Sequence, residues 1–195
     1  MDSPFTVILG AGLSRRFGAP KLDAQCAGQA VGSWVLRAVS AAGLPPGAVV
    51  VGPEAPHFLN EWQSWLRLQN PEPEAGLSSS IAIAARAAAA QGSDAMLVLL
   101  GDMPLVEPDF LRELLAAAAP AATIQDDGRP GVPALLSRAM YPALRNLEGD
   151  RGAGKLLARQ PGLTCLDAPS GMLMDIDRPR DLARAEMILS SRGTA

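Results

Sequence analysis

The stretch that decides the fold is Thr6-Val-Ile-Leu-Gly10-Ala-Gly-Leu-Ser-Arg-Arg-Phe-Gly-Ala-Pro-Lys21, near the start of this 195-residue sequence. It opens with a short apolar run, Thr6 to Leu9, which predicts a buried strand. Glycines and cations follow the run at once. In an open α/β sheet, ligands bind beyond the carboxyl ends of the strands, so this position suits a phosphate-binding loop. The stretch therefore predicts an α/β protein whose first loop holds an anionic ligand.

Further apolar runs alternate with segments of helical period along most of the chain. The predicted strands that follow the first cover residues 48–51, 67–69, 95–100, 122–124 and 132–136, and the predicted helices cover 33–42, 56–66, 79–90, 108–119, 138–147 and 178–191. Strands and helices in alternation imply βαβ units. We expect one three-layer α/β/α, Rossmann-like domain over residues 1–195, with a mostly parallel sheet.

Composition excludes several classes of function. The net charge of −3 argues against a broad nucleic-acid-binding face. A single histidine and two distant cysteines argue against a Cys/His zinc site, a CxxC redox pair and a disulfide framework. No apolar run approaches the roughly 18–20 residues of a membrane span, and the first residues carry no basic signal-peptide region. We expect a cytoplasmic protein that binds neither nucleic acid nor membrane, and an enzyme that needs no histidine base.

The glycine-rich loop matches neither of two common phosphate-binding motifs. The dinucleotide fingerprint GxGxxG begins correctly at Gly10 and Gly12, but Arg15 stands where its third glycine belongs. A Walker loop needs Gly-Lys-Ser/Thr, and Gly18 is followed by alanine. What remains is a pair of glycines that permit close backbone approach, with three cations, Arg15, Arg16 and Lys21. Such a loop suits a triphosphate; the alternative is a solvated basic turn.

Carboxylates stand where a metal ion could be held. Asp102 follows the predicted strand 95–100, a position that suits Mg²⁺ bound against substrate phosphates; the alternative is a turn or helix-cap aspartate. Strand alternation would put Asp175 and Asp177 on one face, a spacing fit for a second metal contact. Asp181 is expected to cap or to form an ion pair in the last helix. Ser78 to Ser80 could likewise cap the helix that they precede.

Four motifs, in order, resemble those of one enzyme family. The pattern L-x-A-G-x-S-x-R-x-G-x-x-K, from Leu9 to Lys21, resembles the signature loop of the nucleotidyltransferases related to molybdenum cofactor guanylyltransferase. The others are Gly76-Leu-Ser-Ser-Ser80, Leu100-Gly-Asp-Met-Pro-Leu105 and Asp175-Ile-Asp-Arg-Pro-Arg-Asp-Leu182. The resemblance runs from Val7 to about Ala185, which is nearly the whole chain.

The resemblance implies a set of site residues. The loop would wrap a nucleoside triphosphate, with Lys21 neutralising the leaving pyrophosphate, and Lys21, Arg16 and Asp102 would be the catalytic residues. Asp102, Asp177 and Asp175 would hold Mg²⁺, with Mn²⁺ as the alternative. The implied nucleotide contacts are Leu9, Gly10, Ala11, Gly12, Ser14, Arg15, Lys21, Gly76, Ser78, Ser79 and Ser80.

The serine-rich turn indicates which nucleotide is used. Gly76-Leu-Ser-Ser-Ser80 resembles the turn with which molybdenum cofactor cytidylyltransferases read base and ribose. The implied reaction is transfer of CMP from CTP to molybdopterin, with release of pyrophosphate. A recipient molybdenum hydroxylase, or its chaperone, would be the further partner.

Two departures from the family pattern concern the acceptor. Val132 stands where the family carries histidine, and Gly154 stands where it carries arginine. The implied acceptor contacts that remain are Gly131, Pro133, Asp150 and Gly152. Three alternatives stay open: the same chemistry with GTP, another phosphorylated acceptor, or a non-catalytic nucleotide-binding protein or cofactor chaperone.

Overall fold

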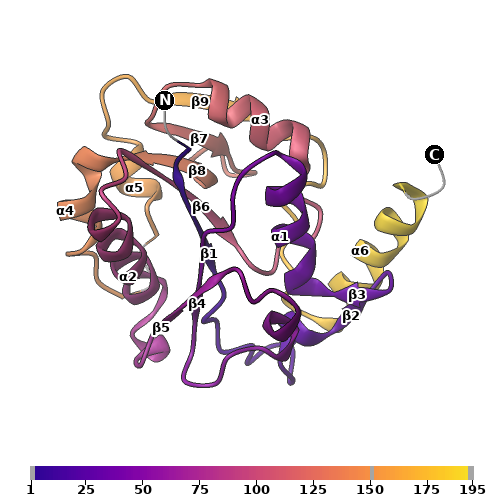
Figure 1. The fold of residues 1–195 in the computed structure, drawn as a ribbon. Coiled ribbons are helices and arrows are strands. Elements are labelled where there is room, and N and C mark those ends of the chain that lie inside the picture. The colour runs from indigo at the N-terminus through magenta and orange to yellow at the C-terminus, as the bar shows by residue number, and fades with distance from the viewer. Residues whose placement is uncertain (1–2, 150–151, 193–195) are drawn as a thin grey trace.

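A seven-stranded sheet forms the centre of the molecule in the computed structural model, which describes residues 3–149 and 152–192 (Figure 1). The strand order is β5-β4-β1-β6-β8-β7-β9. The strands are β1 (Phe5–Leu9), β4 (Ala48–Val51), β5 (Leu66–Gln69), β6 (Ala95–Leu100), β7 (Ala121–Ile124), β8 (Pro130–Ser137) and β9 (Thr164–Asp167). A separate short hairpin pairs β2 (Gln25–Cys26) with β3 (Gln29–Ala30).

The sheet is mostly parallel, as the sequence predicts. β1 runs parallel to both β4 and β6, β4 to β5, and β7 to β9. β8 runs antiparallel to its neighbours β6 and β7. The carboxyl ends of β5, β4, β1 and β6 consequently meet at one edge, where open α/β sheets bind ligands.

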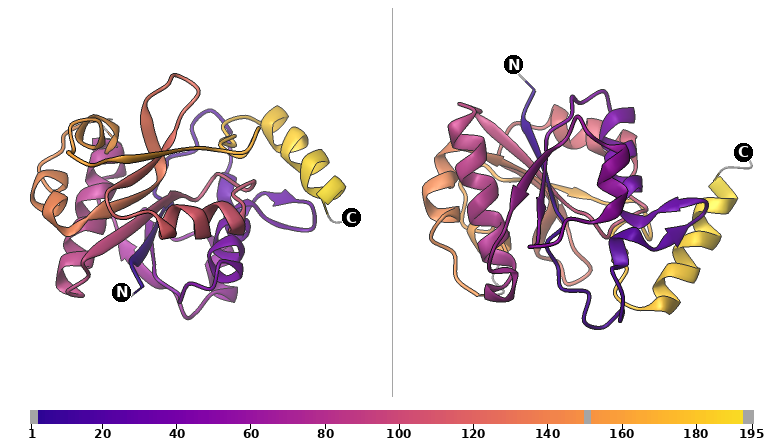
Figure 2. Two further views of the ribbon diagram at one scale, coloured as in Figure 1. Left: turned by 90° about the horizontal axis from the view of Figure 1, so that it is seen from above. Right: turned by 60° about the horizontal axis from the view of Figure 1, so that its bottom comes forward.

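Helices cover both faces of the sheet, which confirms the predicted α/β class. They are α1 (Val31–Ala41), α2 (Leu77–Ala90), α3 (Pro108–Ala116), α4 (Tyr141–Leu144), α5 (Gly154–Leu157) and α6 (Pro179–Arg192). Along β6, Leu97 and Leu99 join the apolar core beneath α1 and α3, whereas Met96 and Val98 join the core beneath α2, α4 and α5. Burial on both faces explains the continuous apolar run of this strand. α6 extends to one side, against the β2–β3 hairpin (Figure 2).

The predicted helix over residues 56–66 is wrong. The chain forms a short 3₁₀ helix, η2 (His57–Glu61), and then enters β5 at Leu66. The Asp23 carboxylate accepts hydrogen bonds from the amides of His57 and Phe58, which holds a single local turn. The Leu66 amide then donates to the Gly47 carbonyl at 2.9 Å, and sheet pairing takes the segment out of helical geometry.

Other boundaries also differ from the predictions. The predicted helix over 138–147 consists of a 3₁₀ turn, η4 (Arg138–Met140), followed by the short α4. The hairpin β2–β3 and the strand β9 were not predicted, because their two to four residues are too short to show a period. Two further 3₁₀ turns are η1 (Lys21–Asp23) and η3 (Pro73–Ala75). Within the described part of the chain, no helix is long and apolar enough to cross a membrane.

Gly47 provides a test of how closely β4 approaches β1. A Cβ at this position would lie 2.0 Å from the carbonyl oxygen of Thr6, a backbone atom of β1 that cannot rotate away. We expect Gly47→Ala to lower the free energy of unfolding by about 2–3 kcal/mol, measured by urea denaturation. The control is Gly52→Ala, whose Cβ would meet nothing within 4 Å and should change stability by less than about 0.5 kcal/mol. Equal effects of the two substitutions would show that β4 is free to move.

Candidate functional site

The glycine-rich loop leaves the sheet between the ends of β4 and β6. The Gly10 amide donates to the Val50 carbonyl at 2.8 Å, and the Gly101 amide donates to the Leu9 carbonyl at 2.9 Å. These bonds continue the parallel ladder one residue beyond the strands. A Cβ at Gly10 would lie 3.2 Å from the Val50 oxygen, so a glycine suits this close approach. The loop and Asp102 therefore emerge side by side.

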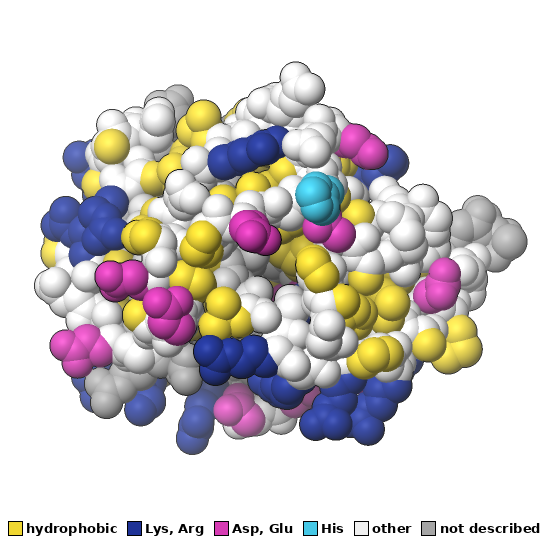
Figure 3. Space-filling view, turned by 90° about the horizontal axis from the view of Figure 1, so that it is seen from below, with side chains coloured by type: hydrophobic (Ala, Val, Ile, Leu, Met, Phe, Trp, Pro, Cys, Tyr) yellow, Lys and Arg dark blue, Asp and Glu magenta, His cyan; other side chains and the backbone are white. Residues whose placement is uncertain are grey.

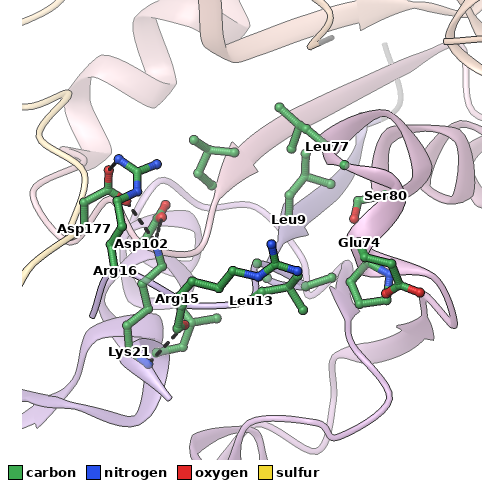
Figure 4. Close-up of a pocket in the computed structure, with 18 residues that line it drawn as sticks. Leu9, Leu13, Arg15, Arg16, Lys21, Glu74, Leu77, Ser80, Asp102 and Asp177 are labelled. Atoms are coloured by element: carbon green, nitrogen blue, oxygen red, sulfur yellow. Dashed lines mark hydrogen bonds and ion pairs between the residues drawn. The ribbon is translucent and has the colours of Figure 1, made fainter. Parts of the chain in front are cut away.

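A cavity of about 440 Å³ lies at this edge (Figure 4). Seen from below in Figure 3, this side of the molecule is hollowed and carries both acidic and basic side chains. In Figure 4, the charged groups of Lys21, Asp102, Asp177 and Arg16 lie on one side of the cavity, and Ser80 and Glu74 lie on the other. The lining residues are Leu9, Gly10, Ala11, Gly12, Leu13, Ser14, Arg15, Arg16, Lys21, Leu22, Pro73, Glu74, Gly76, Leu77, Ser80, Leu100, Asp102 and Asp177.

A compact ion cluster forms the charged side. The Lys21 ammonium lies 2.5 Å from Asp102 Oδ2 and 3.5 Å from Asp177 Oδ1, and the Arg16 guanidinium lies 2.8 Å from Asp177 Oδ2. Lys21 is only 9% exposed, which is unusual for a lysine and requires an anionic partner. The cluster joins residues from the first loop, the end of β6 and the segment before α6.

A tight turn in the loop brings Lys21 to this place. The Ser14 backbone has a positive φ of 50°, and its carbonyl accepts hydrogen bonds from the amides of Phe17 and Gly18. Gly18 also has a positive φ, which a glycine adopts without strain. The chain then reverses into η1, where the Ser14 hydroxyl oxygen accepts a hydrogen bond from the Lys21 amide at 3.4 Å.

Asp177 is positioned by two sets of backbone hydrogen bonds. The Ile176 amide donates to the Asp102 carbonyl at 2.9 Å, which ties this segment to the end of β6. The Asp181 carboxylate accepts from the amides of Asp177 and Arg178, at 3.2 and 2.8 Å. Asp181 therefore caps the start of α6 in the manner of a capping box, which confirms the cap predicted for it.

Asp175 does not line the cavity that Asp102 and Asp177 line. It borders a separate open groove, whereas Asp177 lines the cavity. The segment is not a strand, so the alternation expected to align these two carboxylates does not apply. The pKa of Asp175 is raised to about 7, chiefly by burial of the carboxyl, although part of the residue remains exposed; the charges of Asp102 and Asp177 contribute to the rise and Lys21 opposes it. Among the described residues, no three acidic, histidine or cysteine side chains converge into a metal-binding group.

The serine triplet is divided between two roles. Gly76 and Ser80 line the cavity, but Ser78 and Ser79 do not. The helix begins after Gly76 with no side-chain cap, so the cap predicted for the serines is wrong. Instead, the buried amide of Asn70 donates to the hydroxyl oxygens of Ser79 and Ser80. Asn70 is not among the residues predicted from the sequence, although its polar side chain at the carboxyl end of a strand is a signal of the same kind as Asp102.

The predicted acceptor contacts do not gather at one point. Gly152 borders the groove that contains Asp175, whereas Pro133 is buried within β8. Gly131 packs against the Gln125 side chain. Asp150 lies outside the described residues. A Cβ at Gly154 would lie 2.7 Å from the Pro130 carbonyl oxygen, so this backbone leaves no room for the arginine that the family pattern carries there.

The fold and the site together define a class of protein. The glycine-rich loop and the buried Lys21 follow β1, Asp102 follows β6, and Asp177 lies just before α6. These are the parts with which an α/β nucleotidyltransferase would bind a triphosphate and a cation. The roles of the individual residues stay predictions.

Comparison with known proteins identifies the family. Residues 6–163 match the model of the MobA-like NTP transferase domain. The purine catabolism protein PucB of Bacillus subtilis is 32% identical over 96% of this chain and 100% of its own length. The bifunctional protein GlmU of Bordetella petrii is 31% identical over 87% of this chain but only 39% of that protein. The chain therefore belongs to the MobA-like NTP transferase domain family.

Solved structures share the fold. Rv0371c of Mycobacterium tuberculosis, in complex with manganese, gives a TM-score of 0.73 at 22% identity over 95% of this chain and 99% of its own. The molybdopterin-guanine dinucleotide biosynthesis protein A of Archaeoglobus fulgidus gives a TM-score of 0.64 at 20% identity, over 95% and 98%. At these identities the likeness is one of fold.

The cap on α6 can be tested by its effect on stability. We expect Asp181→Ala to lower the free energy of unfolding by about 1 kcal/mol, because two amide groups at the start of α6 lose their acceptor. Asp109→Ala is the matched control, since Asp109 lies in the first turn of α3 with its side chain 92% exposed. Thermal unfolding of both variants measures the difference, and an Asp181→Ala variant as stable as Asp109→Ala would contradict the capping role.

Proposed function

We propose that this protein transfers CMP from CTP to a phosphorylated acceptor, molybdopterin, and releases pyrophosphate. The observation that carries the proposal is the buried Lys21 ammonium between Asp102 and Asp177, at the mouth of the glycine-rich loop. A buried lysine paired with two carboxylates suits a site in which the carboxylates would bind a metal ion and the lysine would bind phosphate.

The cavity has the features needed to bind a triphosphate. Gly10, Ala11 and Gly12 line it. The Gly10 amide is used by the Val50 carbonyl, so the amides of Ala11 and Gly12 are the ones that would face phosphate oxygens. Arg15, Arg16 and Lys21 supply three positive charges to the lining of the cavity. Cations and backbone amides together bind phosphate oxygens strongly.

The donor set suits a divalent cation. Asp102 and Asp177 both direct a carboxylate oxygen at one point, where Lys21 provides positive charge. Carboxylate oxygens are ligands that Mg²⁺ prefers, and Mn²⁺ accepts the same donors. The manganese complex of Rv0371c supports a divalent ion in proteins of this fold. When bound, the ion would neutralise charge on the phosphates.

The reaction needs no general base from the protein. A terminal phosphate of the acceptor is already ionised near pH 7, so its oxygen can attack the α-phosphorus of CTP directly. The new P–O bond forms as the bond between the α-phosphorus and the bridging oxygen breaks, and pyrophosphate leaves with both electrons of that bond. Lys21 and Arg16 would stabilise the charge on the leaving group, and the loop would hold the phosphates in line.

Two resemblances support the choice of substrates. The Gly76-Leu-Ser-Ser-Ser80 turn is similar to that of cytidylyltransferases, and it favours CTP over GTP. The Archaeoglobus protein, which shares the fold, is named for the biosynthesis of molybdopterin-guanine dinucleotide, so it supports molybdopterin as the acceptor but not the choice of CTP. The groove bordered by Gly152 and Asp175 is our candidate for the acceptor. A molybdenum hydroxylase, or its chaperone, would then receive the product.

The substrate assignment can be tested by pyrophosphate release. We expect turnover with CTP, Mg²⁺ and molybdopterin, and slower turnover with GTP, ATP or UTP. Asp102→Asn should lower kcat by about a hundredfold or more, because an amide cannot supply the charge of the carboxylate, while circular dichroism shows an intact fold. Turnover of GTP without CTP would overturn the cytidylyl assignment. Nucleotide binding with no turnover in any combination would favour a chaperone.

The role of Lys21 can be tested without turnover. We expect Lys21→Met to bind Mn²⁺ about tenfold more tightly than the wild type in the absence of nucleotide, because the competing ammonium is gone and two carboxylates repel each other. CTP should bind the same variant more weakly. Lys155→Met is the control, since Lys155 is the other lysine of the chain and is exposed. Calorimetry measures both affinities; unchanged Mn²⁺ affinity in Lys21→Met would show that the ammonium and the ion do not compete.

A further inference from the structure

Asn70 is a buried polar residue beside the cavity that does not itself line the cavity. It follows β5 directly, at the carboxyl edge of the sheet, and is 1% exposed. Its backbone amide donates to the Val51 carbonyl at 2.7 Å, which fixes it to the end of β4. A buried amide group of this kind is costly unless its donors and acceptor are all used.

Both the oxygen and the nitrogen of the Asn70 side-chain amide form hydrogen bonds. The carbonyl Oδ1 accepts a hydrogen bond from the Glu72 amide at 3.0 Å, and Nδ2 donates to the hydroxyl oxygens of Ser79 at 2.8 Å and Ser80 at 3.0 Å. The direction of these bonds follows from the contact with Glu72. Because a backbone amide can only donate, Oδ1 must face Glu72, and the NH₂ group must face the two serines.

Ser79 and Ser80 differ in whether their hydroxyl hydrogens already have an acceptor in the protein. The Ser79 hydroxyl donates to the Gly76 carbonyl at 2.8 Å, with the Glu72 carbonyl at 3.3 Å, so its hydrogen is used within the loop. The Ser80 hydroxyl accepts from Asn70, and no described residue accepts its hydrogen. Ser80 lines the cavity, opposite the Lys21 cluster (Figure 4). The hydroxyl hydrogen of Ser80 is therefore available to an acceptor in the cavity.

We propose that Asn70 is a positioning residue that makes Ser80 a hydrogen-bond donor toward the nucleoside. This inference rests on the proposed nucleotide-binding function. The chain of bonds runs from Asn70 Nδ2 to the Ser80 hydroxyl and on to an acceptor atom of the ligand, which is an oxygen or ring nitrogen of the base or an oxygen of the ribose. Asn70 also holds the Glu72–Gly76 loop, from which Pro73, Glu74 and Gly76 line the cavity.

Two substitutions test the direction of this chain. Ser80→Ala removes the donor and should raise the dissociation constant for CTP about tenfold. Asn70→Asp replaces the NH₂ donor by an oxygen that accepts, so the Ser80 hydrogen turns away from the cavity, and a similar loss is expected. The double variant should bind CTP no more weakly than the weaker single variant, since both act through one hydrogen bond. Asn146→Asp, an exposed asparagine far along the chain, controls for the added charge.

Steady-state kinetics separates this role from a purely structural one. We expect KM for the nucleotide to rise in Ser80→Ala and Asn70→Asp while kcat stays within about twofold, because Ser80 lies away from Lys21 and Asp102. Ser80→Ala retains the bonds from Asn70 to Ser79 and Glu72, so it remains informative if Asn70→Asp is unstable. A comparison of CTP with 2′-deoxy-CTP identifies the ligand group. Loss of the deoxy penalty in Ser80→Ala indicates the ribose 2′-oxygen, and an equal loss for both nucleotides indicates the base.

The outcomes separate this inference from the proposed function. Binding of every nucleotide by the wild type and by Ser80→Ala with equal affinity would overturn the role of Ser80 and Asn70 and leave the nucleotidyltransferase assignment standing. If the wild type binds GTP in place of CTP, the same variants are measured with GTP. A wild type that binds no nucleoside triphosphate would overturn both.

Discussion

The contact on which the site depends is the Lys21 ammonium held between Asp102 and Asp177. These residues come from the first loop, the end of β6 and the segment before α6, so one cation connects distant parts of the chain. A buried charge is costly when it loses its partner, because the group left behind is desolvated and unpaired. Bonds from Ile176 to the Asp102 carbonyl and from Asp177 to Asp181 hold the carboxylates in place around the ammonium.

The contacts of Lys21 would couple the binding of a metal ion to the binding of a nucleotide. Lys21 is one cation that can pair either with the two carboxylates or with phosphate oxygens of a ligand. Under the proposed function, the carboxylates would release the ammonium when they held a divalent ion, and the phosphates of a nucleotide would give the ammonium a new partner. Each ligand would then improve the affinity for the other, and linkage requires that the improvement be equal in both directions. On this proposal the ion cluster belongs to the free protein, and metal and nucleotide would replace it together.

The parts of the site that could be predicted from sequence are those that depend on local pattern. The loop after β1 and the aspartate after β6 follow strands whose apolar runs are unmistakable, and strand ends meet at one edge of a parallel sheet. The course of the segment around Asp175 and Asp177 depends on a long-range bond from Ile176 to the Asp102 carbonyl, and that of the 56–66 segment depends on bonds to Asp23 and Gly47. No local period in the sequence shows such bonds. The serine triplet was predicted as a cap, because the buried Asn70 that engages it comes from another element.

The candidate contacts for phosphates and cation lie in a different part of the cavity from the candidate contacts for the nucleoside. The phosphates and the cation are common to all nucleoside triphosphates, and their candidate contacts lie on the loop after β1 and the end of β6, at the centre of the sheet. The candidate contacts for the nucleoside, Gly76 and Ser80, lie on the segment after β5, which is an edge strand. An edge segment can change its side chains without disturbing neighbours on both sides. Under the proposed function, this arrangement would let one catalytic centre serve different nucleotides, and the hydrogen-bond direction set by Asn70 would contribute to the choice between them.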